Sequence, residues 1–93
     1  MTLQQLKYAV VTAEKGTVSE AAASLYIAQP SLTKALKELE KEMGISIFNR
    51  TNKGVFVSKE GEVFLGYARQ VLEQAALITE KYTHQSGGKQ EFC

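Results

Sequence analysis

Residues 28–39 read Ala-Gln-Pro-Ser-Leu-Thr-Lys-Ala-Leu-Lys-Glu-Leu, and this stretch decides the fold of the chain. Pro30 favours the first turn of a helix, where its missing N–H leaves no hydrogen bond unmade. Apolar residues then recur at helical spacing, at Leu32, Leu36, Leu39 and Met43. The other side is polar and cationic, with Thr33, Lys34, Lys37 and Lys41. A short helix that is apolar on one side and cationic on the other suits insertion into a DNA groove.

Two more helices are predicted before this one. Thr2 with Gln5, and Thr17 with Glu20, each match the capping-box spacing of a helix start. Glycine at a helix end favours termination, so Gly16 is expected to end the first helix. By the same argument Gly44 ends the third helix. The second and third helices, joined by a turn at residues 26–28, predict a helix-turn-helix over about residues 18–37.

The periodicity changes after Gly44. Two short β-prone runs, residues 45–48 and 55–57, flank the sequence Thr-Asn-Lys-Gly at 51–54. This arrangement predicts a hairpin with a loop of about four residues. The tip is basic, and a basic hairpin after a helix-turn-helix is typical of a wing, here expected over about residues 46–58. The fold class is therefore mainly α with a small β-hairpin, a winged helix-turn-helix occupying residues 1–58.

A long helix is expected to follow over residues 59–83, capped by Ser58. Its apolar residues step by four and three through Phe64, Ala68, Val71, Ala75, Ile78 and Tyr82. This is the spacing of a coiled-coil seam. A helix this long exceeds what so small a domain needs to cover its core. Part of its apolar side must therefore pack outside the domain, so the seam predicts dimerisation. Packing of the helix entirely on the first three helices is the competing interpretation, and it leaves Ala75, Ile78 and Tyr82 uncovered.

Composition narrows the classes of function. The 93 residues carry a formal net charge of +1, with residues 30–59 at +3 and residues 60–93 at −2. A positive middle segment is suited to phosphates, although on charge alone an ordinary mixed surface is the better explanation. The chain has one His, one Cys and no Asp, so catalytic triads and His/Cys metal clusters cannot be assembled. We therefore expect neither an enzyme nor a metal site. The single cysteine cannot form an intrachain disulfide, and the sequence has no signal-peptide pattern and no apolar stretch long enough to span a bilayer, so we expect a cytoplasmic protein with no membrane partner.

Residues 84–93 include Ser-Gly-Gly and read as a hinge. The final Glu-Phe-Cys resembles the start of a further element, which suggests that the sequence is truncated before another domain.

Several motifs occur together in a recognisable order: Thr17-Val18-Ser19-Glu20-Ala21-Ala22, Gln29-Pro30-Ser31, Leu39-Glu40, Gly44, Phe48-Asn49-Arg50 and Ser58-Lys59-Glu60-Gly61. Over residues 2–83 the chain resembles the N-terminal DNA-binding domain of LysR-type transcriptional regulators. The resemblance implies a winged helix-turn-helix, a linker helix that pairs with a second subunit, and an effector-binding domain after the hinge. Ala28 departs from the family, which commonly has serine there.

The resemblance also assigns contacts to DNA. In the recognition helix these fall on Gln29, Pro30, Ser31, Thr33, Lys34 and Lys37, and in the wing on Arg50, Asn52 and Lys53. By residue chemistry, Gln29 suits adenine and Lys34 suits guanine, whereas Lys37 and Lys53 suit phosphates. For Arg50 a structural ion pair with a neighbouring carboxylate is an alternative role.

The implied partners are double-stranded DNA carrying an inverted repeat, a second copy of the chain (or three more in a longer protein) and RNA polymerase. No cofactor is expected within these residues. A small-molecule co-inducer is expected in the missing C-terminal domain. The alternative function is a winged-helix module for protein interaction or dimerisation that does not bind DNA.

Overall fold

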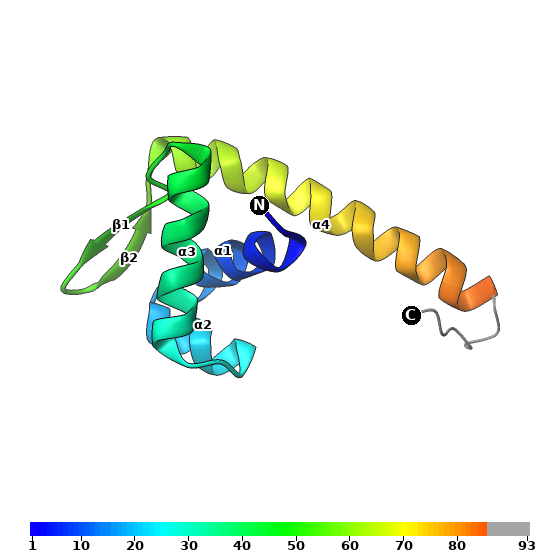
Figure 1. Ribbon diagram of the computed structural model, residues 1–93, viewed down its shortest axis with the longest axis horizontal. Helices are drawn as coiled ribbons and strands as arrows, with labels where there is room; N and C mark the ends of the chain where they lie inside the picture. Colours follow the sequence, from blue (N-terminus) through cyan, green and yellow to red (C-terminus); the bar gives the residue numbers. More distant parts are fainter. Residues whose placement is uncertain (86–93) are drawn as a thin grey trace.

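The computed structural model describes residues 1–85, and it consists of four helices and one hairpin (Figure 1). In chain order the elements are α1 (Leu3–Lys15), α2 (Val18–Leu25), α3 (Gln29–Met43), β1 (Phe48–Thr51), β2 (Gly54–Val57) and α4 (Lys59–Gln85). The predicted fold class is confirmed. The predicted hinge begins at residue 84, but α4 continues through Gln85, and residues 86–93 lie outside the described part.

The helix ends follow local capping chemistry. The Thr2 hydroxyl accepts a hydrogen bond from the Gln5 N–H at 3.0 Å, and the Gln5 side chain accepts one from the Thr2 N–H in return. Thr17 caps α2 through the Glu20 N–H at 3.1 Å. Gly16 and Gly44 end α1 and α3 in the left-handed conformation, as predicted. The third helix begins at Gln29, one residue before Pro30.

A single core joins α1, α2, α3 and the first part of α4. Its largest fully buried apolar side chains are Leu32, Leu36, Leu39, Ile47 and Leu65. Ala21 and Ala22 are buried where α2 meets its neighbours, and their small side chains allow the helices to approach closely. Because three of these leucines come from the apolar side of α3, the opposite side of that helix is left facing outward.

The hairpin is tighter than expected. Thr51 pairs with Gly54, so only Asn52 and Lys53 form the turn, and the predicted loop of about four residues is wrong. Two hydrogen bonds tighten the turn, because the Thr51 hydroxyl donates to the Gly54 carbonyl and accepts from the Lys53 N–H. The run at residues 45–47 precedes the strand, and Ile47 is a core residue.

The fourth helix begins in the core and ends outside it. Leu65 and Ala68 are buried, Leu72 is half-buried, and α4 then leaves the rest of the domain as an arm (Figure 1). At about 1.5 Å per residue, a helix of this length measures about 40 Å. Within residues 1–85, no helix has the combination of length and apolar character needed to cross a membrane.

Candidate nucleic-acid interface

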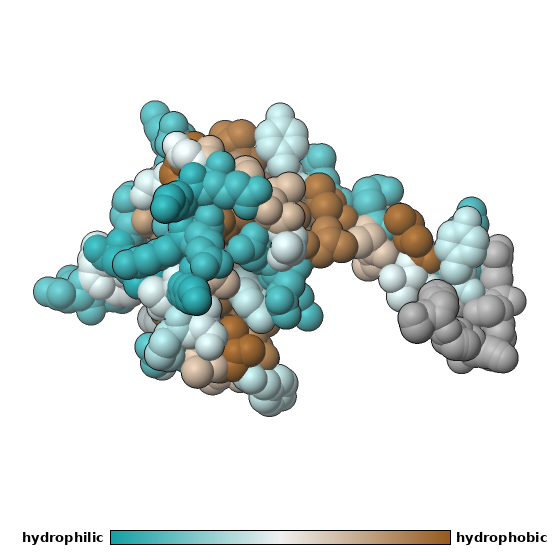
Figure 2. Space-filling view, in the orientation of Figure 1, coloured by the Kyte–Doolittle hydropathy of each residue, from teal (hydrophilic) through white to brown (hydrophobic). Residues whose placement is uncertain are grey.

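The outward side of α3 forms a shallow, open hollow. We call this surface the recognition face, and its lining residues are Gln29, Pro30, Thr33, Lys34, Lys37, Glu38 and Lys41. Polar side chains gather over α3 in the space-filling view (Figure 2). Five of the nine residues predicted to contact DNA are therefore brought together on one surface.

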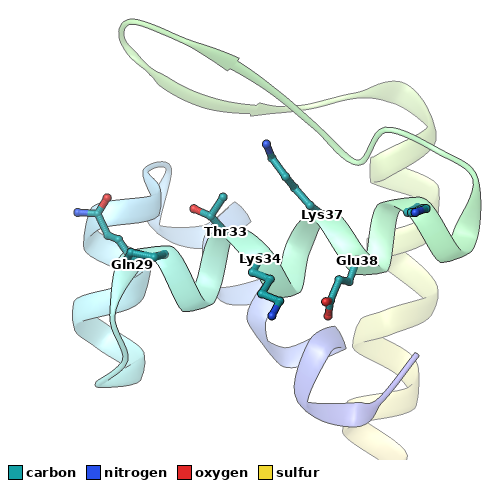
Figure 3. A pocket seen from close by; sticks show the side chains of 7 residues that line it. Gln29, Thr33, Lys34, Lys37 and Glu38 are labelled. Carbon is teal, nitrogen blue, oxygen red and sulfur yellow. The ribbon is translucent and has the colours of Figure 1, made fainter.

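The side chains of the recognition face point in two directions. Thr33 and Lys37 extend toward the hairpin, whereas Lys34 and Glu38 extend to the other side of the helix (Figure 3). Among the described residues, none of these lysines forms an ion pair. Their ammonium groups are thus available for phosphates or for base edges.

Ser31 is exposed but does not line the hollow. Its N–H donates to the Ala28 carbonyl at 3.1 Å, and Ala28 supplies no side-chain cap to α3. The start of α3 therefore lacks the side-chain hydrogen bond that caps α1 and α2, because alanine at position 28 has no hydroxyl. A hydroxyl at Ser31 and backbone N–H groups at a helix start are both suited to contact phosphate.

The wing carries the other three predicted contacts. Arg50, Asn52 and Lys53 are all exposed, and Asn52 and Lys53 form the tip of the hairpin. The strand register places Arg50 opposite Val55. In the described part of the chain no carboxylate pairs with Arg50, so the structural ion pair considered for it is not formed.

A backbone hydrogen bond fixes the wing against the helices. The Val55 N–H donates to the Gly16 carbonyl at 2.9 Å, which joins β2 to the turn between α1 and α2. Gly54 lies beside this contact with φ +137°, and a Cβ at Gly54 would lie 2.7 Å from the Gly16 oxygen. Only glycine fits there without displacing the backbone.

One residue that positions the wing is not predicted from the sequence. Glu40 Oε2 accepts hydrogen bonds from the backbone N–H groups of Ile47 and Phe48, at 2.8 and 3.0 Å. The carboxylate thereby ties the last turns of α3 to the start of β1. The sequence feature that could have indicated this role is the Leu39-Glu40 pair. Its acidic residue lies beside the apolar side of α3 and not on the outward side.

Gly61, whose role is likewise not predicted from the sequence, permits close contact between α4 and the segment before β1. A Cβ on Gly61 would lie 2.2 Å from the Ile47 carbonyl oxygen. Ser58 completes the junction by capping α4 through the Gly61 N–H at 2.9 Å and by donating its hydroxyl hydrogen to the Ser46 carbonyl.

The predicted dimerisation seam is divided between two environments. Ala68 is 2% exposed and Phe64 packs against the core, so their contacts are intramolecular. Val71, Ile78 and Tyr82 are 42%, 61% and 58% exposed, and Ala75 is half-buried. Apolar side chains are visible along this arm (Figure 2).

The exposed apolar side of α4 begins earlier than predicted, with residues that were not assigned to the seam. Val63 and Tyr67 are 63% and 65% exposed, and they precede Val71 at steps of four. A shallow hollow on the arm is lined by Gln70, Val71, Gln74, Ala75 and Ile78. No group of three or more metal-ligating side chains occurs within the described residues.

Comparison with known proteins identifies the family. Residues 3–62 match the model of the bacterial regulatory helix-turn-helix proteins of the lysR family. The chain belongs to the LysR family. It is 44% identical over 72 residues to the HTH-type transcriptional regulator TfdT of Cupriavidus pinatubonensis, an alignment that covers 77% of this chain and 32% of TfdT. It is 39% identical over 72 residues to the regulator ClcR of Pseudomonas putida, covering 77% of this chain and 24% of ClcR.

Solved structures agree with this assignment to the LysR family. The DNA-binding domain of CbnR in a DNA complex superposes with a TM-score of 0.86 at 31% identity, over 92% of this chain and 99% of that one. The corresponding domain of BenM, in complex with benA site 1 DNA, gives a TM-score of 0.85 at 32% identity, over 90% and 98%. The chain spans a third or less of the length of the two curated relatives named above.

Proposed function

We propose that this chain is the DNA-binding part of a transcription regulator and that it binds double-stranded DNA with sequence preference. The observation that carries the proposal is the recognition face, an outward helix surface whose three lysines form no ion pair with any residue in 1–85, beside an exposed basic wing. The complexes of the CbnR and BenM domains with DNA support it, because this chain has their fold over nearly its whole length.

The proposed roles follow from side-chain chemistry. Gln29 and Lys34 read base edges in the major groove, the first at adenine and the second at guanine. Lys37, Arg50 and Lys53 neutralise phosphates, while Ser31, Thr33 and Asn52 donate hydrogen bonds to the backbone or to bases. Pro30 fixes the geometry of the first turn of α3, from which Gln29 projects.

We further infer that two copies pair through the exposed apolar side of α4, at Val71, Ala75, Ile78 and Tyr82. A dimer of this kind carries two recognition helices related by a two-fold axis, so its DNA site is an inverted repeat of half-sites. A tetramer, RNA polymerase as a further partner, a cytoplasmic location and a co-inducer bound by another domain are proposals drawn from the family. That the protein is not an enzyme is also a proposal drawn from the family.

Selection of bound duplexes from a random pool tests the function directly. We expect enrichment of an inverted repeat, and single half-sites that bind more weakly than the pair because one small module buries little surface. The alternative, a winged module that contacts only protein, predicts no enrichment and no binding to any duplex at low ionic strength. That result is incompatible with the proposed function.

A further inference from the structure

Glu38 is the acidic residue of the recognition face, and the contacts assigned to DNA leave it without a role. It is exposed on α3 and lines the same hollow as Lys34, Lys37 and Lys41. Lys34 precedes it by four positions and Lys41 follows it by three, both at spacings that allow pairing along a helix. Nevertheless, among the described residues no cation pairs with the Glu38 carboxylate.

Charge is distributed unequally across α3. On the side toward the wing, Thr33 and Lys37 extend outward (Figure 3). On the other side Lys34 extends outward together with Glu38 (Figure 3), and Glu42 follows Glu38 by one helical turn. The Glu42 carboxylate is paired with the amino terminus of Met1, so its charge is compensated. Glu38 forms no ion pair with any described residue, although Lys34 extends to the same side of α3.

We propose that Glu38 determines specificity by opposing placements of DNA on the side of α3 away from the wing; the inference rests on the proposed function. Binding to DNA without sequence preference depends almost wholly on phosphate neutralisation. When α3 binds a duplex without sequence preference, its position is not fixed, and Glu38 can approach phosphates. The repulsion between the carboxylate and the phosphates then weakens this nonspecific binding. In the cognate complex, Lys37 and the wing hold the phosphate backbone toward the wing while Lys34 reaches a base edge, so the carboxylate repels the duplex less.

The test compares the intact chain with Glu38→Gln, which keeps the side-chain shape and removes the charge. Affinities for a selected operator and for a random duplex of equal length are measured across a salt series. The matched control is Glu73→Gln, an equal charge change at an exposed position on α4. We expect Glu38→Gln to tighten random binding by about three- to tenfold at low salt and the operator by less. The salt slope for random DNA should steepen, and Glu73→Gln should change neither affinity comparably.

Three results overturn the inference while leaving the proposed function intact. The first is an unchanged ratio of operator to random affinity in Glu38→Gln. The second is a weaker operator complex with random binding unaltered, which means that Glu38 reads a base such as cytosine through its amino group. The third is an equal effect of Glu73→Gln. If instead the unsubstituted chain binds neither duplex, the proposed function itself fails.

Discussion

The Glu40 side chain and the Phe48 backbone are joined by a hydrogen bond of 3.0 Å between Oε2 and the amide nitrogen. The same oxygen also accepts from the Ile47 N–H at 2.8 Å. One carboxylate on the helix that carries the recognition face thus fixes where the wing begins. The spacing between the recognition face and the wing therefore depends on a residue that is not expected to touch DNA.

Replacing this carboxylate should destabilise the domain and displace the wing. Glu40→Ala leaves two partly buried N–H groups without their acceptor, which should lower the free energy of unfolding by about 1.5–3 kcal/mol. Urea unfolding followed by circular dichroism measures the change. Glu14→Ala, at an exposed position on α1, is the control and should stay within about 0.5 kcal/mol. Equal effects of the two substitutions would show that the Glu40 hydrogen bonds contribute little.

The junction between α4 and the wing should tolerate no side chain at Gly61. Gly61→Ala places a methyl group 2.2 Å from the Ile47 carbonyl oxygen, so the backbone must move. We expect a loss of more than about 2 kcal/mol in the free energy of unfolding. Gly66→Ala is a matched control in the same helix, because nothing lies within 4 Å of its Cβ. That substitution should stabilise the domain by about 0.5–1 kcal/mol. Thermal melts that show both variants equally stable would contradict the packing described here.

Tyr26 adopts φ 59° in the turn between α2 and α3, a left-handed conformation that disfavours side chains with a Cβ. It is also 94% exposed, so little packing is lost when it is replaced. Tyr26→Gly should raise the free energy of unfolding by about 0.5–1 kcal/mol, and Tyr26→Val should lower it. Chemical denaturation distinguishes these outcomes, and a Tyr26→Gly protein less stable than the original would reveal a stabilising contact of the ring.

Pairing through the α4 arm should be abolished by a charge on its exposed apolar side. Val71→Glu buries a carboxylate in the proposed dimer interface and should yield a monomer in sedimentation equilibrium. Ala76→Glu introduces the same side chain at an exposed position five residues along, on the other side of the helix. The control should remain a dimer. A Val71→Glu protein of unchanged mass would exclude this surface from the interface.

Removal of a phosphate contact and removal of a base contact should have different consequences. Lys37→Ala should weaken binding to every sequence and reduce the salt slope by about one, because a lysine ammonium neutralises one phosphate. Gln29→Ala should cost about 1–3 kcal/mol on the operator and relax the preference at one base pair. Fluorescence anisotropy with operator and random duplexes separates the two patterns. If Gln29→Ala binds both duplexes as before, the readout role assigned to Gln29 is wrong.

Local chemistry made much of this domain predictable from its residues. Helix starts at Thr2 and Thr17 and helix ends at Gly16 and Gly44 were anticipated, because each depends on hydrogen bonds between residues at most four apart. The periodicity of α3 likewise predicted which side is buried. Since the apolar side of α3 is buried, its lysines had to lie on the outward side. These lysines and the family motifs together predicted the recognition face.

Tertiary packing decided what these local rules could not. One apolar repeat runs along α4, yet Ala68 is buried in the core while Ile78 is 61% exposed among the described residues. The roles of Glu40 and Gly61 arise from contacts with residues 47 and 48, on other segments of the chain. Periodicity along one helix reports which side is apolar, but only the arrangement of the surrounding elements determines how far burial extends and which backbone groups come within hydrogen-bonding distance.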